Sequence, residues 1–335
     1  MTYTLKDIAI VVLNWNGQQL LEKFLPSVIE HSVGTSIYVI DNASSDDSIS
    51  FLQRQYPNIK TIINEENYGF AGGYNKGLKH VKQPILCLLN NDIEVTKGWL
   101  QPILNSFNTD ETNAIIQPKI LDYKKRTHYE YAGAAGGFID KYGYPFCRGR
   151  LFDALEKDEG QYNDEQNIFW ASGACFFIKS SLFKQLNGFD ESFFAHMEEI
   201  DLCWRTFNNN HKIIYNGKST VYHLGGGTLK TSNPKKTFLN FRNSLLTLTK
   251  NTGGAVLFLI FIRLMLDGVG GFRFLLKGQT SHFIAVLKAH FSYYKNLPKA
   301  LKFRKLQNKK RKDYYKTKSV IWAYFIQNKK TFKEL

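Results

Sequence analysis

Residues 85–95 read ILCLLNNDIEV, a continuous apolar run that stops abruptly at two amides and a carboxylate. Three other apolar runs, at residues 8–13, 36–41 and 59–64, also end in polar residues, and each of the four is followed by a helical pattern. Apolar strands that alternate with helices are typical of a parallel sheet covered on both faces. The first part of the chain is therefore predicted to have an α/β fold.

The polar residues that end these runs are expected to meet at one edge of the sheet. Ligands of such sheets bind outside the carboxyl ends of the strands. Asn and Asp are common turn formers, so each one alone has an ordinary structural explanation. Four successive strand ends of this kind, with the carboxylates of Asp41 and Asp92 among them, indicate a polar pocket. They are Asn14-Trp15-Asn16, Asp41-Asn42, Asn64 to Asn67, and Asn90-Asn91-Asp92.

The expected pocket lacks the usual phosphate-binding loops. The first strand is followed by NWNGQQL (14–20) with a single glycine instead of GxGxxG, and no GxxxxGK[ST] occurs in the sequence. A diphosphate bound here needs another source of positive charge. A divalent cation held by Asp92 is the simplest source, since carboxylate oxygens suit Mg²⁺ or Mn²⁺.

Seven motifs follow one another between residues 8 and 228: VVLNWNG, VIDNASSDDS, NYGFAGGYNKG, LLNNDIEV, ASGACFFIKSSLFKQLNGFDESFF, EEIDLCWR and VYHLGGGT. In this order they resemble glycosyltransferase family 2, in its rhamnosyltransferase-like branch. The resemblance implies the GT-A fold, a Rossmann-like, mostly parallel mixed sheet flanked by helices. It also implies a nucleotide-sugar site in the first half of this region and an acceptor site in the second.

The resemblance assigns several strand-end residues to the nucleotide-sugar site. Asp41 matches the carboxylate that contacts the nucleotide base, and Asn14 would form another wall of the base pocket. Asn91 is expected to reach the ribose. In the glycine-rich motif, missing side chains let the backbone approach the nucleoside. The matching residues there are Asn67, Gly69, Gly72 and Asn75.

The predicted metal site departs from the family pattern. Asn90-Asn91-Asp92 occupies the place of the DxD motif, but only the last carboxylate is present. The resemblance gives Asp92 to the metal and adds His223 as a second ligand. A histidine at a strand end also has a purely structural interpretation, and one carboxylate binds a cation more weakly than two.

The segment HMEEIDLCWRTF (196–207) predicts the start of a helix with three acids in its first turn. The helix dipole favours acids there, which is the alternative to a catalytic role. The resemblance makes Glu199 the general base, although the family usually has Asp and the register with Glu198 is open. Neighbouring carboxylates raise one another's pKa, which suits a base near neutral pH. The residues assigned to the acceptor site are Trp170, Gly173, Glu198 and Asp201, with core packing as the alternative for Trp170.

The charge of the chain is uneven. The net charge is +15 overall, yet residues 228–335 carry 23 Lys/Arg against 3 Asp/Glu. We therefore expect a GT-A domain at 1–227, with a donor half (1–110) and an acceptor half (111–227), and a basic, amphipathic helical region at 228–335. Its longest apolar run, 255–262, is far shorter than the roughly 20 residues of a membrane span. Contact with an anionic membrane surface is expected, with a soluble helical cap as the alternative.

Together these features predict an inverting glycosyltransferase that needs a divalent cation, Mg²⁺ or Mn²⁺. It would move a sugar, rhamnose in the branch resembled, from a nucleoside diphosphate to a hydroxyl of a glycan or lipid-linked acceptor in bacterial surface polysaccharide synthesis. Two alternatives remain: a non-catalytic nucleotide-sugar-binding protein of the same fold, and a nucleotidyltransferase. Nucleic acid is not expected as a partner. The N-terminal residues lack a signal-peptide pattern and the four cysteines form no CxxC pair, so a cytoplasmic protein, peripheral on the inner face of the membrane, is expected.

Overall fold

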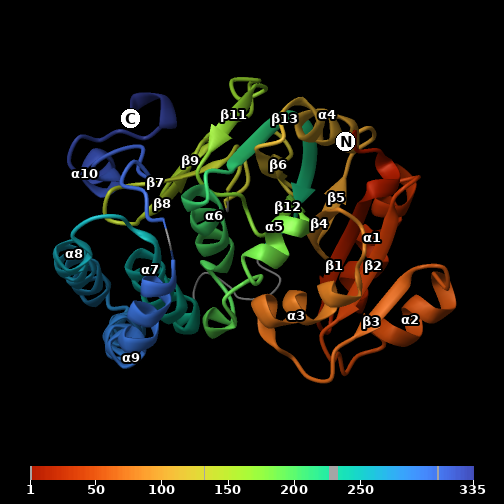
Figure 1. The fold of residues 1–335 in the computed structure, drawn as a ribbon. Coiled ribbons are helices and arrows are strands. Elements are labelled where there is room, and N and C mark those ends of the chain that lie inside the picture. Colours follow the sequence, from red (N-terminus) through yellow and green to blue (C-terminus); the bar gives the residue numbers. More distant parts are fainter. Residues whose placement is uncertain (1, 132, 226–232, 308) are drawn as a thin grey trace.

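The computed structural model describes residues 2–131, 133–225, 233–307 and 309–335. Within these residues a mixed sheet of nine strands occupies the centre of the N-terminal part (Figure 1). Its order is β11-β13-β6-β12-β4-β1-β2-β3, and β5 pairs with β13. The strands are β1 (Ile8–Asn14), β2 (Ser36–Asp41), β3 (Lys60–Ile63), β4 (Ile85–Asn90), β5 (Ile93–Val95), β6 (Asn113–Asp122), β11 (Glu165–Ile168), β12 (Cys175–Lys179) and β13 (Lys212–His223).

The four apolar runs of the sequence form the parallel half of this sheet. Strands β4, β1, β2 and β3 are parallel neighbours. Strand β12 lies antiparallel between β4 and β6 and makes the sheet mixed. The predicted α/β class, with a mixed sheet flanked by helices, is therefore confirmed.

Two apolar cores lie on the two faces of the sheet. Along β1, Ala9 and Val11 enter one core and Ile10 and Val12 the other, because successive side chains of a strand point to opposite faces. Helices α3, α5 and α6 contribute to the first core, and α1, α2 and α4 to the second. The helices are α1 (Gln18–His31), α2 (Ser48–Gln55), α3 (Gly69–Gly77), α4 (Leu100–Thr109), α5 (Ser180–Gln185) and α6 (Glu198–Asn208).

A small antiparallel sheet joins this domain to the end of the chain. It has the order β10-β9-β8-β7. The backbone N–H of Val320 donates to the carboxylate of Asp140, and the Tyr314 hydroxyl donates to the carbonyl of Lys141. The strands are β7 (Gly137–Ile139), β8 (Pro145–Cys147), β9 (Arg150–Leu151) and β10 (Ala154–Leu155).

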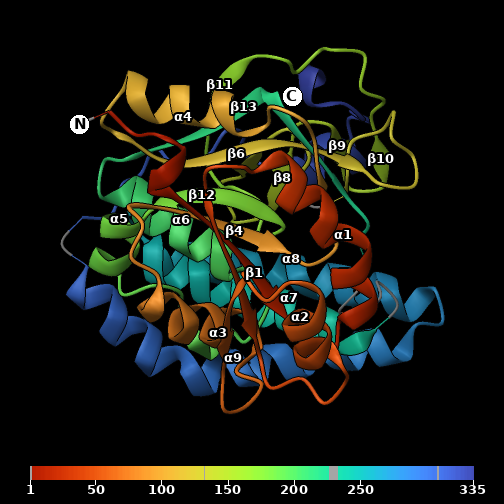
Figure 2. The same cartoon turned by 90° about the vertical axis from the view of Figure 1, so that its right-hand side faces the viewer.

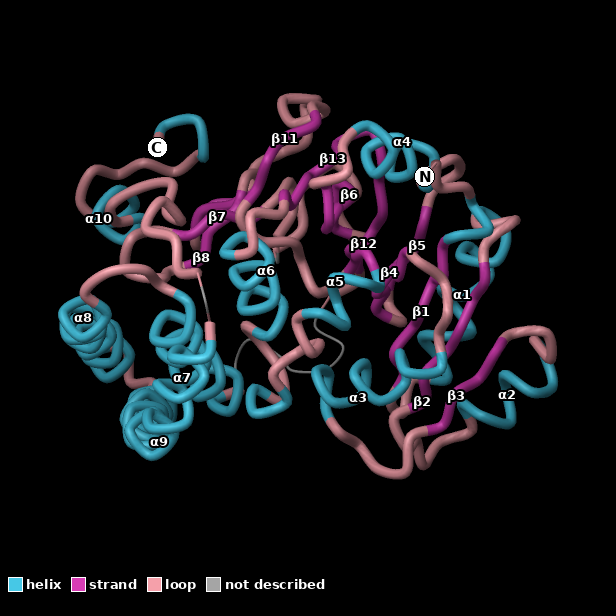
Figure 3. The backbone as a smooth tube through the Cα atoms, in the orientation of Figure 1, coloured by secondary structure: helices cyan, strands magenta, loops and turns pink. Residues whose placement is uncertain are grey.

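The C-terminal region is helical, as predicted. Figure 1 shows its helices together on the left, with α6 between α7 and the sheet. Figure 3, in which helices are cyan and strands magenta, shows the same group of helices. Figure 2 shows the long helices running behind the sheet across the molecule. The expected domain boundary at residues 227 and 228 lies outside the described residues. The helices are α7 (Pro234–Asn251), α8 (Val256–Leu276), α9 (Thr280–Leu306) and α10 (Val320–Phe325).

Among the helices described, none combines the length and the apolar character that crossing a bilayer requires.

Candidate active site

The carboxyl ends of the parallel strands meet in a network of amides around one carboxylate. Asn14 ends β1 and lies opposite Asp41 of β2 in the sheet register. Its Nδ2 donates to Asp41 Oδ2 at 3.1 Å, and its Oδ1 accepts from Asn91 Nδ2 at 2.9 Å. Three residues predicted for the donor site, from three different strand ends, are thus brought together.

Asp41 also has the kind of local backbone contact that gives a strand-end Asp an ordinary structural role. Its Oδ1 accepts a hydrogen bond from the backbone N–H of Ser44 at 2.8 Å. The network continues through Asn42, whose Nδ2 donates to Asn67 Oδ1 at 2.9 Å and whose Oδ1 accepts from Asn64. The backbone N–H of Asn42 donates to the carbonyl of Asn14 at 2.8 Å, so this second group adjoins the first. We call the two groups together the amide row, which runs from the ends of β1, β2 and β3 to the start of the glycine-rich motif.

The glycines of that motif allow close backbone packing. Gly69 has a φ of +70°, and a Cβ there would lie 2.6 Å from the carbonyl oxygen of Phe194. The backbone N–H of Phe70 donates to the same oxygen at 2.9 Å. A Cβ at Gly72 would collide with the Cβ of Tyr68. The glycines thus bring the donor half into contact with the segment that precedes α6.

The structure does not bring Asn75 to this edge. Asn75 lines a cavity together with Leu86, which lies near the start of β4, at the opposite end of that strand from Asn90. Its amide donates to the carbonyl of Phe189 and accepts from the backbone N–H of the same residue. The side chain therefore holds the 187–191 loop instead of facing the amide row.

Asp92 and His223 converge from two strands. The antiparallel pairing of β5 with β13 places His223 opposite Ile93, and Nε2 of His223 lies 3.1 Å from Oδ1 of Asp92. On the other side of the imidazole, Nδ1 lies 3.2 Å from Oε1 of Glu130. All three side chains are buried. Burial lowers the pKa of His223, but the carboxylates of Asp92 and Glu130 more than offset this and raise it to about 10.

These groups fit part of a divalent-cation site. Oδ1 of Asp92 is out of contact with solvent and, apart from the imidazole, no described group hydrogen-bonds to it. An oxygen and an imidazole nitrogen that converge in this way are suitable ligands for Mg²⁺ or Mn²⁺. The described residues provide no group of three His, Cys, Asp or Glu side chains that would hold a cation by themselves. The site would therefore be completed by ligand oxygens.

Sequence reasoning missed Glu130. A carboxylate on the second nitrogen of a histidine fixes the orientation of the ring, as it does beside many metal-binding histidines. Glu130 comes from the loop after β6, where its N–H donates to the carbonyl of Ile120. No motif marks this position, because the contact joins segments about ninety residues apart.

Helix α6 places two glutamates at its first turn. It begins after a strained segment in which Phe194, His196 and Met197 all have positive φ. Non-glycine residues in this conformation are costly and cluster at functional sites. Gly173 lies beside Glu199, and a Cβ built there would be 3.7 Å from Cγ of Glu199 and 3.5 Å from the ring of Phe70.

The two glutamates differ in accessibility. Glu198 is buried, whereas Glu199 is half-buried. Each has an Oε2 atom that contacts neither solvent nor a described hydrogen-bonding group. Burial raises the pKa of Glu199 to about 7, and burial together with the charge of Glu199 raises the pKa of Glu198 well above its ordinary range. The more accessible Glu199 is the better placed of the two to receive a proton near neutral pH.

Comparison with known proteins identifies the family. The model of the family "Glycosyl transferase family 2" matches residues 9–186, more than half of the chain. The chain belongs to glycosyltransferase family 2.

Characterised relatives of this glycosyltransferase are distant. It is 25% identical over 213 residues to the low-salt glycan biosynthesis hexosyltransferase Agl10 of Haloferax volcanii, covering 62% of this chain and 64% of the relative. It is 21% identical over 231 residues to an N-acetylglucosaminyl-diphospho-decaprenol L-rhamnosyltransferase of Mycobacterium tuberculosis, covering 64% of this chain and 75% of the relative. The chain thus spans just under two thirds of the length of the first of these relatives.

Solved structures confirm the GT-A fold. The glycosyltransferase resembles GalNAc-T7, crystallised with UDP, GalNAc and Mn²⁺, with a TM-score of 0.61 at 15% identity over 95% of this chain and 56% of the other. It also resembles the mannosyltransferase PcManGT of Pyrobaculum calidifontis, in complex with GDP-Man and Mn²⁺, with a TM-score of 0.53 at 13% identity over 86% and 87%.

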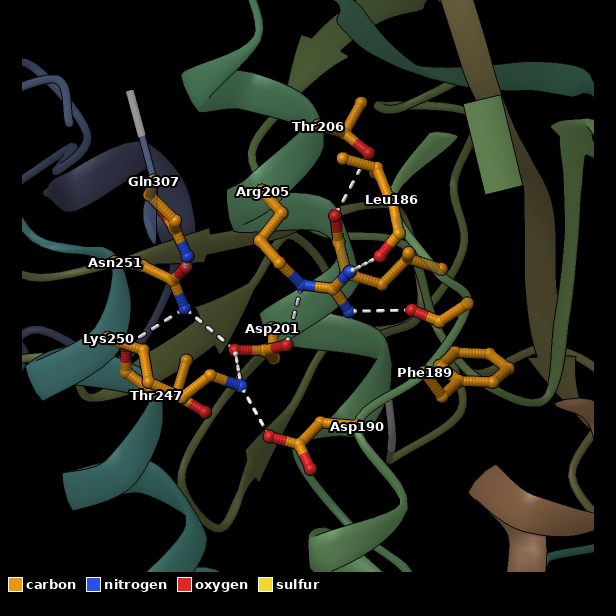
Figure 4. Close-up of polar contacts among 12 residues, drawn as sticks. Leu186, Phe189, Asp190, Asp201, Arg205, Thr206, Thr247, Lys250, Asn251 and Gln307 are labelled. Carbon is orange, nitrogen blue, oxygen red and sulfur yellow. Dashed lines mark hydrogen bonds and ion pairs between the residues drawn. The ribbon is translucent and has the colours of Figure 1, made fainter. Parts of the chain in front are cut away.

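Asp201 of the glycosyltransferase lies in a buried network between α6 and α7, and not in an open acceptor site (Figure 4). Its Oδ2 accepts from Arg205 Nε at 2.8 Å. Its Oδ1 accepts from Asn251 Nδ2 at 2.7 Å and lies 2.9 Å from Nζ of Lys250, which also contacts Asp190 at 2.7 Å. The Asp201 side chain is fully buried and is paired with two cations, Arg205 and Lys250, so it fixes α6 against α7 instead of binding an acceptor.

Trp170 is a core residue. Only 6% of it is exposed, and its indole N–H donates to the carbonyl of Phe138 at 2.7 Å. The ring packs so closely on Gly137 that a side chain there would overlap it. The structure therefore favours the packing interpretation over stacking on a sugar.

A second contact from α7, also missed by sequence reasoning, holds the strained segment before α6. The side-chain amide of Asn243 donates to the carbonyls of Phe193, Ala195 and His196 at 3.2, 3.0 and 2.7 Å. Arg242 donates to the carbonyl of Phe193 at 3.2 Å. The C-terminal region thus contributes directly to the geometry in front of Glu199.

Proposed function

We propose that this enzyme is an inverting glycosyltransferase that moves a sugar from a nucleoside diphosphate to an acceptor hydroxyl. The observation that carries the proposal is the position of Glu199. This half-buried carboxylate has a pKa raised to about 7, and it adjoins Gly173, as Phe70 of the donor half does. It is a base for the acceptor at the side of the predicted nucleotide-sugar site.

The nucleoside is proposed to bind along the amide row. Asp41 is fully buried and accepts from Asn14 and from the backbone N–H of Ser44, and its proposed role is to accept a base N–H in place of one of these donors. Asn91, in the same network, is proposed to contact the ribose. Asn67 extends the row toward the glycine-rich motif. Bases differ in their N–H groups, so the partners of Asp41 would decide which nucleotide binds.

Asp92 and His223 are proposed to hold Mg²⁺ or Mn²⁺ together with diphosphate oxygens. A cation there would offset the negative charge that develops on the leaving diphosphate. Two related structures contain Mn²⁺ with a nucleotide or nucleotide sugar, which supports this assignment. Glu130 would keep the imidazole of His223 oriented toward the ligand position.

The transfer needs one displacement. Glu199 accepts the proton of the acceptor hydroxyl as the hydroxyl oxygen forms a bond to the anomeric carbon. The bond from that carbon to the diphosphate oxygen breaks on the opposite face, and the electron pair leaves with the diphosphate. One displacement inverts the anomeric configuration, and no covalent intermediate on the enzyme is required.

The acceptor is proposed to be a glycan carried on a lipid, as in assembly of bacterial surface polysaccharides. A relative named for a diphospho-decaprenol acceptor and for rhamnose supports this class and makes rhamnose the first sugar to test. A lipid-linked acceptor would require the enzyme to work at the inner face of the cytoplasmic membrane.

Calorimetric titration tests the donor site. UDP, dTDP and GDP, each with and without Mn²⁺, are added to the wild type, to Asp92→Ala and to the exposed control Asp153→Ala. We expect one nucleotide to bind in the presence of metal to the wild type and the control, and binding to be lost in Asp92→Ala. Failure of all three nucleotides under every condition would overturn the proposal.

A further inference from the structure

Helix α8 buries two of its three charged side chains, and its exposed side is apolar apart from Arg273. Arg263 and Asp267, one turn apart, are 3% and 1% exposed, and Arg263 Nε lies 2.9 Å from Asp267 Oδ1. A helix on the surface of a soluble protein usually has the reverse arrangement. The sequence of α8 is therefore inverted relative to a surface helix that faces water.

The orientation of α8 is fixed by these buried charges. Arg263 also donates to the carbonyl of Tyr142 at 2.9 Å and to the hydroxyl of Ser244 at 2.6 Å. Asp267 accepts a hydrogen bond from the hydroxyl of Tyr144 at 2.7 Å. Rotating the helix about its axis to cover its apolar side would break this network and leave Arg263 and Asp267 without their hydrogen-bond partners. The exposed apolar side is thus a fixed feature of the fold.

The exposed side of α8 forms a continuous apolar row. Its members recur about once per turn, and between 56% and 74% of each side chain is exposed. Over this length the row extends about 30 Å at a rise of about 1.5 Å per residue. We call it the α8 face, and it consists of Leu257, Phe258, Phe261, Met265, Val269, Phe272 and Leu276.

Neighbouring elements extend the α8 face. The guanidinium of Arg273 lies over the ring of Phe325 at 4.6 Å, so α10 adjoins the C-terminal end of α8. Helix α10 and the residue after it expose Trp322, Phe325 and Ile326. Apolar patches of this extent on a monomer mark a surface that binds something.

Positive charge accompanies the exposed apolar side chains. Helix α9 packs beside α8, with Val286 against Gly271. It exposes Phe291, 75% accessible, and Tyr294. The same helix exposes lysines but no acidic residue, and these are Lys288, Lys295, Lys299, Lys302 and Lys305. A second copy of the chain would bring two basic regions together, whereas an anionic lipid surface has the complementary charge.

We propose that the α8 face, together with the exposed side chains of α10, is the surface by which this enzyme docks on an anionic lipid bilayer. The helix lies in the plane of the headgroups, with Phe258, Phe261 and Phe272 among the acyl chains and the lysines of α9 near the phosphates. The inference rests on the proposed function only for its purpose, since a docked enzyme meets an acceptor carried on a lipid.

Vesicle co-sedimentation of the full chain tests the proposal. The vesicles are phosphatidylcholine alone and phosphatidylcholine mixed with phosphatidylglycerol. The wild type is compared with Phe258→Gln/Phe261→Gln/Phe272→Gln, and with the control Val33→Gln/Leu155→Gln, whose exposed apolar residues lie elsewhere. We expect the triple variant to bind the anionic vesicles at least about tenfold more weakly and the control to bind as the wild type does.

A charge variant separates the two contributions. Lys288→Glu/Lys295→Glu/Lys299→Glu should lose the preference for phosphatidylglycerol. Added salt should likewise weaken binding of the wild type to vesicles that contain phosphatidylglycerol. Equal vesicle binding by the triple phenylalanine variant and the wild type would overturn the proposal. A wild-type dimer that the triple variant abolishes, without vesicle binding by either, would identify a second copy as the occupant and also overturn it.

Nucleotide titration of the same variants keeps this proposal distinct from the proposed function. Vesicle binding without binding of any nucleotide would remove the donor-site proposal and leave the docking surface in place. Nucleotide binding without vesicle binding would leave the donor-site proposal in place and overturn the docking surface.

Discussion

Nζ of Lys250 lies 2.9 Å from Oδ1 of Asp201. Helix α7 of the basic C-terminal region therefore neutralises a carboxylate that is buried in α6. The same ammonium contacts Asp190 at 2.7 Å, just before the strained segment. The basic C-terminal region is therefore joined to residues 1–227 through buried ion pairs.

Lys250→Met should destabilise the fold strongly. The change leaves Asp201 and Asp190 without their shared cation, and breaking a buried ion pair costs about 3–5 kcal/mol. Urea unfolding followed by circular dichroism measures the free energy of unfolding. The control Lys288→Met, at an exposed lysine of α9, should change it by less than about 0.5 kcal/mol. Equal midpoints and slopes for both variants would contradict the assigned role.

Glu199→Gln should remove most of the turnover while leaving donor binding intact. Loss of a general base lowers kcat by about 10²–10⁴-fold, and Glu199 is not part of the amide row that would hold the nucleoside. Glu198→Gln is the matched comparison, since it changes the adjacent glutamate to the same amide. A larger loss of kcat in Glu198→Gln than in Glu199→Gln would reverse the register of the two acids.

The pH dependence of activity and of stability should run in opposite directions. Glu199 must be ionised to accept a proton, so kcat/KM should fall about tenfold per unit as the pH drops below about 7. Between its ordinary value of 4.5 and about 7 the folded enzyme holds a proton on Glu199 that the unfolded chain has released. The Glu199 contribution to stability is therefore present below pH 4.5 and is lost as the pH rises through this window. Unfolding curves of wild type and Glu199→Gln from pH 4.5 to 8 measure it, and parallel curves would show that the pKa is not raised.

Asn243→Ala should lower kcat more than it weakens nucleotide binding. The substitution removes the donor to three carbonyls in residues 193–196, which precede Glu199. A buried carbonyl that loses its hydrogen-bond donor costs about 1–3 kcal/mol. This free energy is enough to let the strained segment relax. Asn296→Ala on α9 is the control, since its amide donates to the carbonyl of Ser292 within its own helix. Hydrogen exchange at residues 193–197 should increase in Asn243→Ala, and unchanged exchange with unchanged kcat would count against the assigned role.

Glu130→Gln should weaken metal binding and leave the fold in place. The amide keeps the size of the side chain but no longer favours one orientation of His223, and loss of such a partner costs about 10–100-fold in metal affinity. Titration of Mn²⁺ in the presence of the nucleotide that binds measures the effect. Affinity equal to that of the wild type would mean that His223 does not depend on Glu130.

Strand positions and strand ends could be predicted from the sequence because they depend on local pattern. Continuous apolar runs mark parallel strands, and their polar ends must share an edge of the sheet, which is how Asn14, Asp41 and Asn91 came to be grouped. The antiparallel insertion of β12 between β4 and β6 could not be predicted in this way, since its pairing partners are remote in the chain.

Motif membership did not separate residues that hold the site from residues that face it. Asp201 and Asn75 occur in the motifs, yet their polar groups are engaged with Lys250 and with the backbone of Phe189. Glu130 and Asn243 are the opposite case, because no short-range pattern marks them. Only the folded chain brings Glu130 to His223, and Asn243 to the carbonyls before α6. Burial and hydrogen bonding, which depend on the whole fold, decide these roles.

The link between α6 and α7 also has a consequence for the order of events during synthesis. Asp201 is made about fifty residues before the Asn251 and Lys250 side chains that complete its surroundings. A nascent chain that has emerged only to the end of β13 has the glutamates but neither the cation for Asp201 nor the amide of Asn243 for the preceding carbonyls. The surroundings of Asp201 and of the carbonyls before α6 are therefore completed only once α7 has left the ribosome, and α8 with its apolar face is the next helix to follow.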